Sequence, residues 1–126
     1  MIRRLKIGGR EFPALYSLRV AMYVSERYGS AGKALFDESL PAATLLEQRL
    51  DVMRELIVAG AVFQRLEEGT EPGPMPTAEE LMDLISARGM DELVLEMMEC
   101  ITEEDRADFE ARARDAGKNA EATPDQ

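Results

Sequence analysis

Carboxylates are the groups in this chain whose type and number could support acid–base chemistry. The 126 residues include 25 Asp and Glu but no His, which is the commonest general base and metal ligand. Without His the usual Ser/His and Cys/His nucleophile arrangements cannot form, and the single Cys100 cannot anchor a zinc site. Runs of acid such as Glu103, Glu104 and Asp105 are typical of solvated helix ends. We therefore expect no enzyme activity, no catalytic residues, no cofactor and no metal.

Apolar side chains between residues 81 and 98 are the better candidates for a functional surface. Met suits such a surface because its unbranched, polarizable side chain repacks against many partners. Met at helical spacing also fills ordinary cores, so the structural interpretation stands beside the functional one. We predict that a partner binds on six side chains: Leu81, Met82, Ile85, Leu93, Met97 and Met98.

The net charge of −10 is distributed unevenly, with +5 on residues 1–36 and −15 on the rest. The excess of acid argues against a nucleic-acid partner, because phosphate neutralisation needs clustered cations. Apolar stretches of only a few residues argue against a membrane span and a secretory signal. The lone Cys100 fits a reducing compartment. We expect a cytoplasmic protein with no membrane partner. The basic start and acidic remainder could attract one another within or between subunits, but a solvated surface is the safer interpretation of these charges.

A β-hairpin is predicted over residues 2–16. Gly8 and Gly9 can adopt the positive φ that both positions of a type I′ turn require. The turn sets four pairs of residues opposite each other: Ile7 and Arg10, Lys6 and Glu11, Leu5 and Phe12, Arg3 and Ala14. Pro13 must lie on an edge because it cannot donate a ladder hydrogen bond. An isolated hairpin is marginal in water, so its apolar face should pack on helices.

Residues 17–116 predict about five or six helices from apolar periodicity and end signals. The predicted helices cover residues 18–28, 30–39, 44–68, 77–88, 92–101 and 103–116. Capping boxes are predicted at Thr44 with Glu47 and at Thr77 with Glu80. Gly89 is the predicted stop of one helix, and Asp91 the predicted cap of the next.

The helix over residues 44–68 is apolar around most of its circumference, so it should be the central one. Gly60 within it costs roughly 1 kcal/mol in helix propensity, and close approach of another backbone is the expected compensation. Residues 69–76 are rich in Pro and Gly and predict an exposed loop, which is an internal break rather than a domain boundary.

The last predicted helix is mostly charged, with Phe109 as its one large apolar residue, so it could fray or stay undocked. Residues 117–126 lack apolar periodicity and predict a disordered tail. The expected fold class is α+β and predominantly α-helical. Residues 1–116 form one domain in this interpretation, with the hairpin at 2–16 and the helices at 17–116.

Several short strings resemble, in order, the sequences of phage tail assembly chaperones. Residues 7–12, 16–19 and 26–29 (IGGREF, YSLR and ERYG) are similar to the N-terminal signature of that family. LIVAG at 56–60 is similar to its central helix, and PTAEEL at 76–81 resembles the start of the next helix. The resemblance covers about residues 2–100, and the Pro-rich loop and the polar end after Thr102 depart from it.

The resemblance implies a cytoplasmic helper of siphophage-like viruses or prophages. Such a protein binds the helical, aggregation-prone tape measure protein, keeps it soluble while tail tube subunits polymerise around it, and is absent from the mature virion. The family often makes a second, longer product by ribosomal frameshifting, which recruits tail tube protein. The resemblance therefore implies the tape measure protein, and tail tube protein beside it, as partners; a homo-oligomer is a further expectation, since an apolar groove can meet a second copy.

Two other functions stay open at this point. The −15 charge of residues 37–126 suits an acidic regulatory protein that occupies the basic site of a DNA-binding partner. The basic hairpin argues against a wholly acidic mimic of that kind. A structural tail or connector component of the virion is the other alternative.

Overall fold

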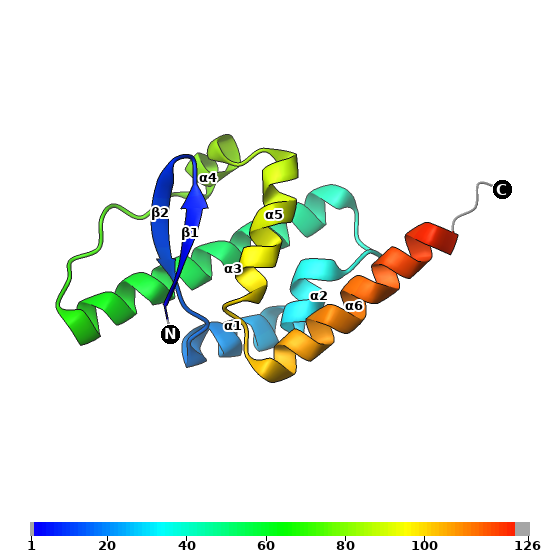
Figure 1. Ribbon diagram of the computed structural model, residues 1–126, viewed down its shortest axis with the longest axis horizontal. Helices are drawn as coiled ribbons and strands as arrows, with labels where there is room; N and C mark the ends of the chain where they lie inside the picture. The colour runs from blue at the N-terminus through cyan, green and yellow to red at the C-terminus, as the bar shows by residue number, and fades with distance from the viewer. Residues whose placement is uncertain (1, 123–126) are drawn as a thin grey trace.

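A β-hairpin followed by six α-helices makes up residues 2–122, the part of the chain that the structure describes. The structure is a computed structural model, and it describes side chains for residues 2–116. The predicted α+β, predominantly helical fold class is confirmed, and the chain forms one small domain. Figure 1 shows the longest central helix running behind the hairpin, with the C-terminal helix along the opposite side of the molecule.

The hairpin has the predicted register. Strands β1 (Arg3–Ile7) and β2 (Arg10–Ala14) pair antiparallel, with all four predicted pairs opposite each other and Pro13 opposite Arg4. Gly8 and Gly9 have φ of 59° and 80°, as a turn of this type requires. Alternation along the strands buries Leu5 and Phe12 on the face toward the helices and leaves Lys6 and Glu11 exposed.

Helix α3 (Ala42–Phe63) is the central element and continues as one π-helical segment, η1 (Gln64–Glu68). A Cβ at Gly60 would lie 2.6 Å from the backbone nitrogen of Ala14 and the carbonyl carbon of Pro13. The Leu15 amide also donates to the Leu56 carbonyl oxygen at 3.0 Å. The predicted close backbone approach at Gly60 is therefore confirmed, and the approaching backbone is β2.

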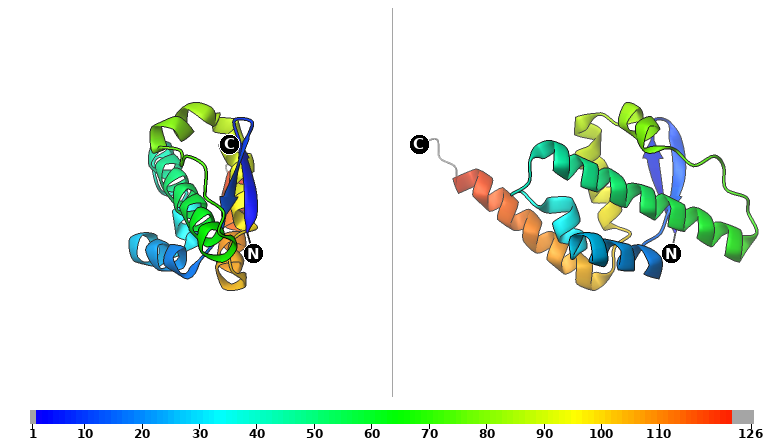
Figure 2. Two further views of the ribbon diagram at one scale, coloured as in Figure 1. Left: turned by 90° about the vertical axis from the view of Figure 1, so that its left-hand side faces the viewer. Right: turned by 180° about the vertical axis from the view of Figure 1, so that it is seen from behind.

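Helices α1 (Leu18–Tyr28) and α2 (Ala31–Phe36) cover another side of α3. Ser17 and Ser30 cap them, each accepting a backbone N–H from the third residue along. Helix α2 ends before the predicted residue 39 because Asp37 accepts from the backbone N–H and the hydroxyl of Ser39, which favours a turn. Figure 2 shows α1 and α2 packed to one side of α3.

The start of α3 differs from the prediction. The helix begins at Ala42 after Pro41, and no side chain caps it, so the predicted capping box of Thr44 with Glu47 is wrong. Ala42 and Ala43 are strong helix formers and extend the helix toward Pro41. Thr44 therefore lies inside the first turn, where it cannot act as the cap.

The segment after the Pro-rich loop forms α4 (Ala78–Leu84) and α5 (Ala87–Met98). The capping box of Thr77 with Glu80 is confirmed. The predicted stop at Gly89 and cap at Asp91 are wrong, because Ser86 caps α5 by accepting the Gly89 N–H at 2.9 Å. A glycine costs little in the first turn, where its amide lacks a helical partner, so α5 begins before it.

The last helix, α6 (Glu103–Ala122), packs against α2 along its first half. Phe109 is 1% exposed and meets Phe36 edge to face, with ring centroids 4.8 Å apart. The expectation that this helix could stay undocked is therefore wrong. The disordered tail predicted over 117–126 is also wrong as far as Ala122, because the helix continues there; residues 123–126 lie outside the described part.

Candidate functional site

An apolar groove opens between the first half of α3 and helices α4 and α5. Its volume is about 380 Å³. Glu47 and Ser86 contribute polar groups to the groove, whose larger apolar lining residues are Leu46, Leu50, Leu81, Met82, Ile85 and Met90. We call this hollow the α3–α4 groove.

The lining side chains differ in how far a partner could reach them. Leu81 and Met90 are almost wholly buried and form the floor. Met82 is 57% exposed and Leu46 is 39% exposed, so they present apolar surface to the outside from opposite helices. Ile85 is half-buried at the end of α4, where the chain turns toward α5. A partner that enters the groove would therefore contact a floor of buried side chains and the exposed apolar side chains of Met82 and Leu46 on either side of it.

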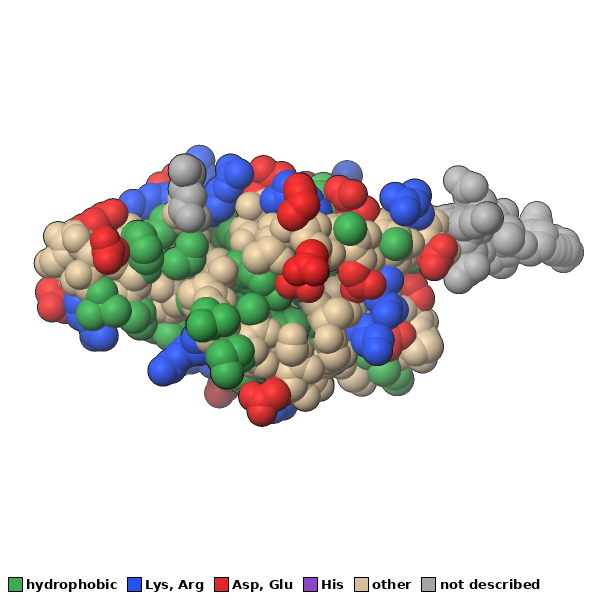
Figure 3. Space-filling view, turned by 90° about the horizontal axis from the view of Figure 1, so that it is seen from below, with side chains coloured by type: hydrophobic (Ala, Val, Ile, Leu, Met, Phe, Trp, Pro, Cys, Tyr) green, Lys and Arg blue, Asp and Glu red, His purple; other side chains and the backbone are tan. Residues whose placement is uncertain are grey.

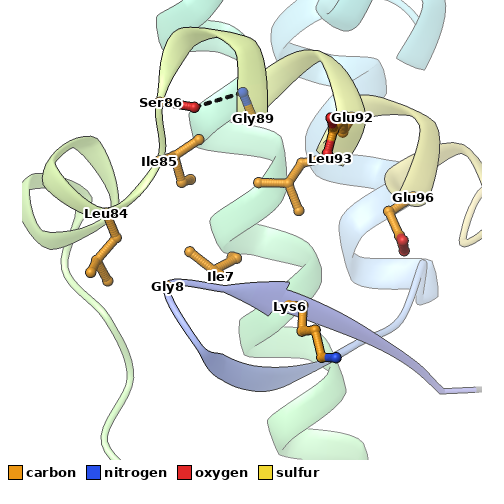
Figure 4. A pocket seen from close by; sticks show the side chains of 10 residues that line it. All are labelled: Lys6, Ile7, Gly8, Leu84, Ile85, Ser86, Gly89, Glu92, Leu93 and Glu96. Atoms are coloured by element: carbon orange, nitrogen blue, oxygen red, sulfur yellow. Dashed lines mark hydrogen bonds between the residues drawn. The ribbon is translucent and has the colours of Figure 1, made fainter.

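A second hollow of about 260 Å³ lies between the hairpin turn and the α4–α5 segment. Figure 4 shows Ile85 and Leu93 pointing toward Ile7, while Lys6, Glu92 and Glu96 add charged groups to the lining. Ile85 lines both hollows and so lies between them. The second hollow is the more polar of the two because of these three charged side chains.

The hairpin turn supports α4 beside the second hollow. A Cβ at Gly8 would lie 2.8 Å from Cδ2 of Leu84, so the turn and the end of α4 are in close contact. Gly8 also has a positive φ of 59°, which disfavours any other residue. The wall of the α3–α4 groove therefore rests on the hairpin as well as on α3.

The six predicted partner-binding residues do not form one surface. Leu81, Met82 and Ile85 lie together in the α3–α4 groove, and Leu93 lines the second hollow. Met97 is fully buried in the core, so it cannot touch a partner. Met98 is half-buried and packs against the core.

Three of the larger apolar lining residues were absent from the prediction: Leu46, Leu50 and Met90. The sequence did carry a signal for the first two, which lie four positions apart and so share one helix face. The apolar circumference of the central helix concealed which of its faces stays open. The mistaken helix stop at Gly89 placed Met90 between two helices rather than on the floor of a groove.

Further apolar side chains are exposed away from the groove. Leu18 and Met22 on α1 are 77% and 57% exposed, and Leu66 in η1 is 73% exposed. Figure 3 shows hydrophobic side chains gathered on the underside of the molecule, over α1 and the end of α3. What distinguishes the α3–α4 groove is therefore its concave shape rather than apolar exposure alone.

The groups whose pKa values are raised owe the change to burial and to hydrogen bonds within the fold. Burial, followed by the hydrogen bond to Asp51, raises the pKa of Tyr23 to about 12. Tyr16 has its pKa raised by burial and by its hydrogen bond to Asp105 on α6. Burial raises the pKa of the Cys100 thiol to about 11, so the thiol stays protonated and poorly nucleophilic near neutral pH. These groups join helices or lie in the core, and none lines the groove.

The described residues show two further negative findings. Among them, no group of three or more Cys, Asp or Glu side chains is placed to hold a metal ion. Over the same part of the chain, the helices are too short or too polar to span a bilayer.

Comparison with known proteins gave no assignment. The chain matches no protein-family model, no curated protein and no solved structure. The resemblance to tail assembly chaperones therefore stays a prediction from the short strings quoted above.

Proposed function

We propose that this protein is a phage or prophage tail assembly chaperone that binds the tape measure protein without catalysing a reaction. The observation that carries the proposal is the open, apolar α3–α4 groove. Met82 and Leu46 remain exposed on its flanks beside a buried floor, although a closed core would have covered them. A concave apolar site with few polar groups is the usual form of a binding site for another molecule.

The shape of the groove suits a helical client. An amphipathic helix binds a groove by placing apolar side chains at spacings of three and four residues into it. Met82 and Met90 provide side chains that repack at little strain, which lets one groove accept helices of different sequence. The resemblance supplies the identity of that client, since tape measure proteins are long, helical and prone to aggregate.

The charge of the chain supports the same role. A net charge of −10 favours solubility of a complex that carries an apolar client, and it repels other loaded copies. In this proposal the protein acts in the bacterial cytoplasm and leaves before the virion is complete. Tail tube protein is its second partner, and nucleic acid and membrane are not partners.

Co-expression with the tape measure protein tests the proposal. We expect the intact chain to move the tape measure protein into the soluble fraction. A double variant of the groove, Leu46→Lys with Met82→Lys, should lose this effect because it places charge on both open flanks. The matched control is Leu95→Lys, which adds charge at a residue that is 58% exposed on α5 and does not line the groove.

Two results would contradict the proposal. One is a tape measure protein that stays insoluble with the intact chain, and the other is a groove variant that works as well as the control. Mass spectrometry of purified virions separates the chaperone from a structural component, because a chaperone should be missing from the particle.

A further inference from the structure

The charged residues around the α3–α4 groove are mainly acidic. Glu47 lines the groove itself. On α4, Glu79 lies three positions before Met82, on the same side of the helix, and Asp83 directly follows Met82. All three carboxylate-bearing residues are exposed. One carboxylate therefore lines the groove, and two more lie on α4 close to Met82, which forms one of its open flanks.

The cations near the groove are largely engaged or set apart from its open side. Arg49 is 7% exposed, donates to the Leu35 carbonyl oxygen at 2.8 Å and pairs with Asp91. Arg54 is half-buried and donates to the Pro76 carbonyl oxygen. Arg88 is exposed in the first turn of α5. Two exposed cations, Arg88 and Lys6 of the adjoining second hollow, thus stand against Glu47, Glu79 and Asp83, and the second hollow adds the carboxylates of Glu92 and Glu96.

We infer that the α3–α4 groove accepts an amphipathic helix whose apolar stripe is flanked by Lys or Arg. This inference rests on the proposed function and specifies which segment of a client enters the groove. An apolar stripe fills the hollow between Leu46 and Met82, and cations beside the stripe meet the carboxylates on the edge. Complementary charge at the edge of an interface mainly sets the partner and the association rate, while the apolar contact holds the complex together.

A second copy of this chain is the other occupant that the surface suggests, since α1 exposes Leu18 and Met22 beside Arg19. In that arrangement α1 of one copy would enter the groove of another. The two surfaces differ, so the contact would be head to tail and would extend into a chain of copies unless a ring closed. A client helix of another protein leaves a closed one-to-one complex, so we favour it.

Two synthetic peptides distinguish the charge preference. Both carry the same Leu stripe at helical spacing, and the flanking positions hold Lys in one peptide and Glu in the other. Fluorescence anisotropy with the full chain should show the Lys peptide binding about tenfold more tightly at low salt. The difference should shrink severalfold at roughly 0.5 M salt, because the charges are exposed and screened.

A triple variant locates the preference. Glu47→Gln, Glu79→Gln and Asp83→Asn together should bring the two peptides to within about twofold of each other, with binding of the Leu stripe retained. The control changes an equal number of exposed carboxylates elsewhere, at Glu67, Glu68 and Glu71 in η1 and the following loop, each to Gln. This control removes three negative charges, as the triple variant does, and should keep the preference for Lys.

Three results would overturn the inference: equal binding of both peptides by the intact chain, a preference for Lys that survives the triple variant, and concentration-dependent self-association that the Lys peptide reverses. The last would assign the groove to a second copy. These results are separable from the co-expression test. A soluble tape measure protein with no charge preference contradicts only this inference, while a clear preference beside an insoluble tape measure protein contradicts only the proposed function.

Discussion

Two regions of the molecule differ in how completely their apolar side chains are covered. Where α6 meets α2, a charged helix covers the apolar side chains of α2 with Phe109, which is 1% exposed. Between α3 and α4, helices with more apolar residues leave Met82 and Leu46 open to the outside. The contact between α2 and α6 is sealed, and the α3–α4 groove is not.

This difference teaches that the number of apolar residues on a helix does not decide whether the helix docks. Helix α6 docks through one aromatic ring and through Asp105 and Asp108, which accept hydrogen bonds from Tyr16 and Ser30 at 2.6 and 2.8 Å. The groove has abundant apolar surface but no partner from this chain among the described residues. Stability should therefore reside in the sealed contact and binding in the open one.

The largest expected effect is at the sealed contact. Phe109→Ala should lower the free energy of unfolding by about 3–5 kcal/mol, because it leaves a cavity beside Phe36. Urea denaturation measures the loss. Phe63→Ala is the matched control, since Phe63 is 36% exposed and its loss leaves no closed cavity. Similar losses for the two variants would show that α6 does not seal the fold.

The next effect tests how closely α2 and α6 approach. A Cβ at Gly32 would overlap the Asp108 carboxylate and come within 2.6 Å of Cδ of Arg112. The Asp108 and Arg112 side chains can yield only by giving up the hydrogen bonds that the Asp108 carboxylate accepts from Ser30 and Arg112. Overpacking that disrupts such contacts costs about 1–3 kcal/mol, which outweighs the roughly 1 kcal/mol that Ala gains over Gly in a helix. Gly32→Ala should thus lower the melting temperature. Gly73→Ala should leave the melting temperature nearly unchanged, because a Cβ there has nothing within 4 Å. Equal melting temperatures for the two variants would show that α2 and α6 do not approach so closely at Gly32.

A third, smaller effect depends on pH and concerns the contact of α1 with α3. Tyr23 and Tyr28 both donate to Asp51, and their pKa values are raised, that of Tyr23 from 10 to about 12. Because the unfolded chain loses these protons first, stability from this contact is present below pH 10 and is lost between about pH 10 and 12. Unfolding free energies measured across that range should fall less steeply for Tyr23→Phe than for the intact chain. Parallel curves would contradict the effect.

The smallest effect on stability should come from the groove. Met82→Ala should change the free energy of unfolding by less than about 0.5 kcal/mol because the side chain is 57% exposed. The same change should weaken binding of the client in a pull-down assay. Met97→Ala, at a fully buried position, should instead cost about 2–5 kcal/mol. If Met82→Ala destabilised the fold as much, the groove would be part of the core rather than a binding surface.

Features that depend on the backbone freedom of a single glycine were the most predictable from the sequence. The Gly8–Gly9 turn fixes the hairpin register because each glycine tolerates positive φ, and Gly60 indicates a close backbone by lacking a Cβ. The boundary between α4 and α5 was not predictable in the same way. Ser86 and Asp91 are both good caps by residue type, and in the structure Ser86 is the cap, which places Met90 inside the helix and in the core.

The sequence did not show which distant side chains meet. Phe36 and Phe109 lie far apart along the chain, so no periodicity links them, and the charged pattern of α6 concealed its docking. The same holds for the candidate site. Met82 and Ile85 could be named from α4 alone, whereas Leu46 became a groove residue only once α4 had packed beside it.

The bare contact between β2 and α3 at Gly60 has a mechanical consequence. A methyl group at Gly60 would push β2 away from α3, because the Pro13 and Ala14 atoms that it would meet belong to the main chain and cannot rotate away as a side chain can. The hairpin would then tilt as a unit, and its turn at Gly8 is in close contact with Leu84 at the end of α4. One methyl group added in the interior would thereby shift α4 and change the width of the α3–α4 groove, with which it makes no contact.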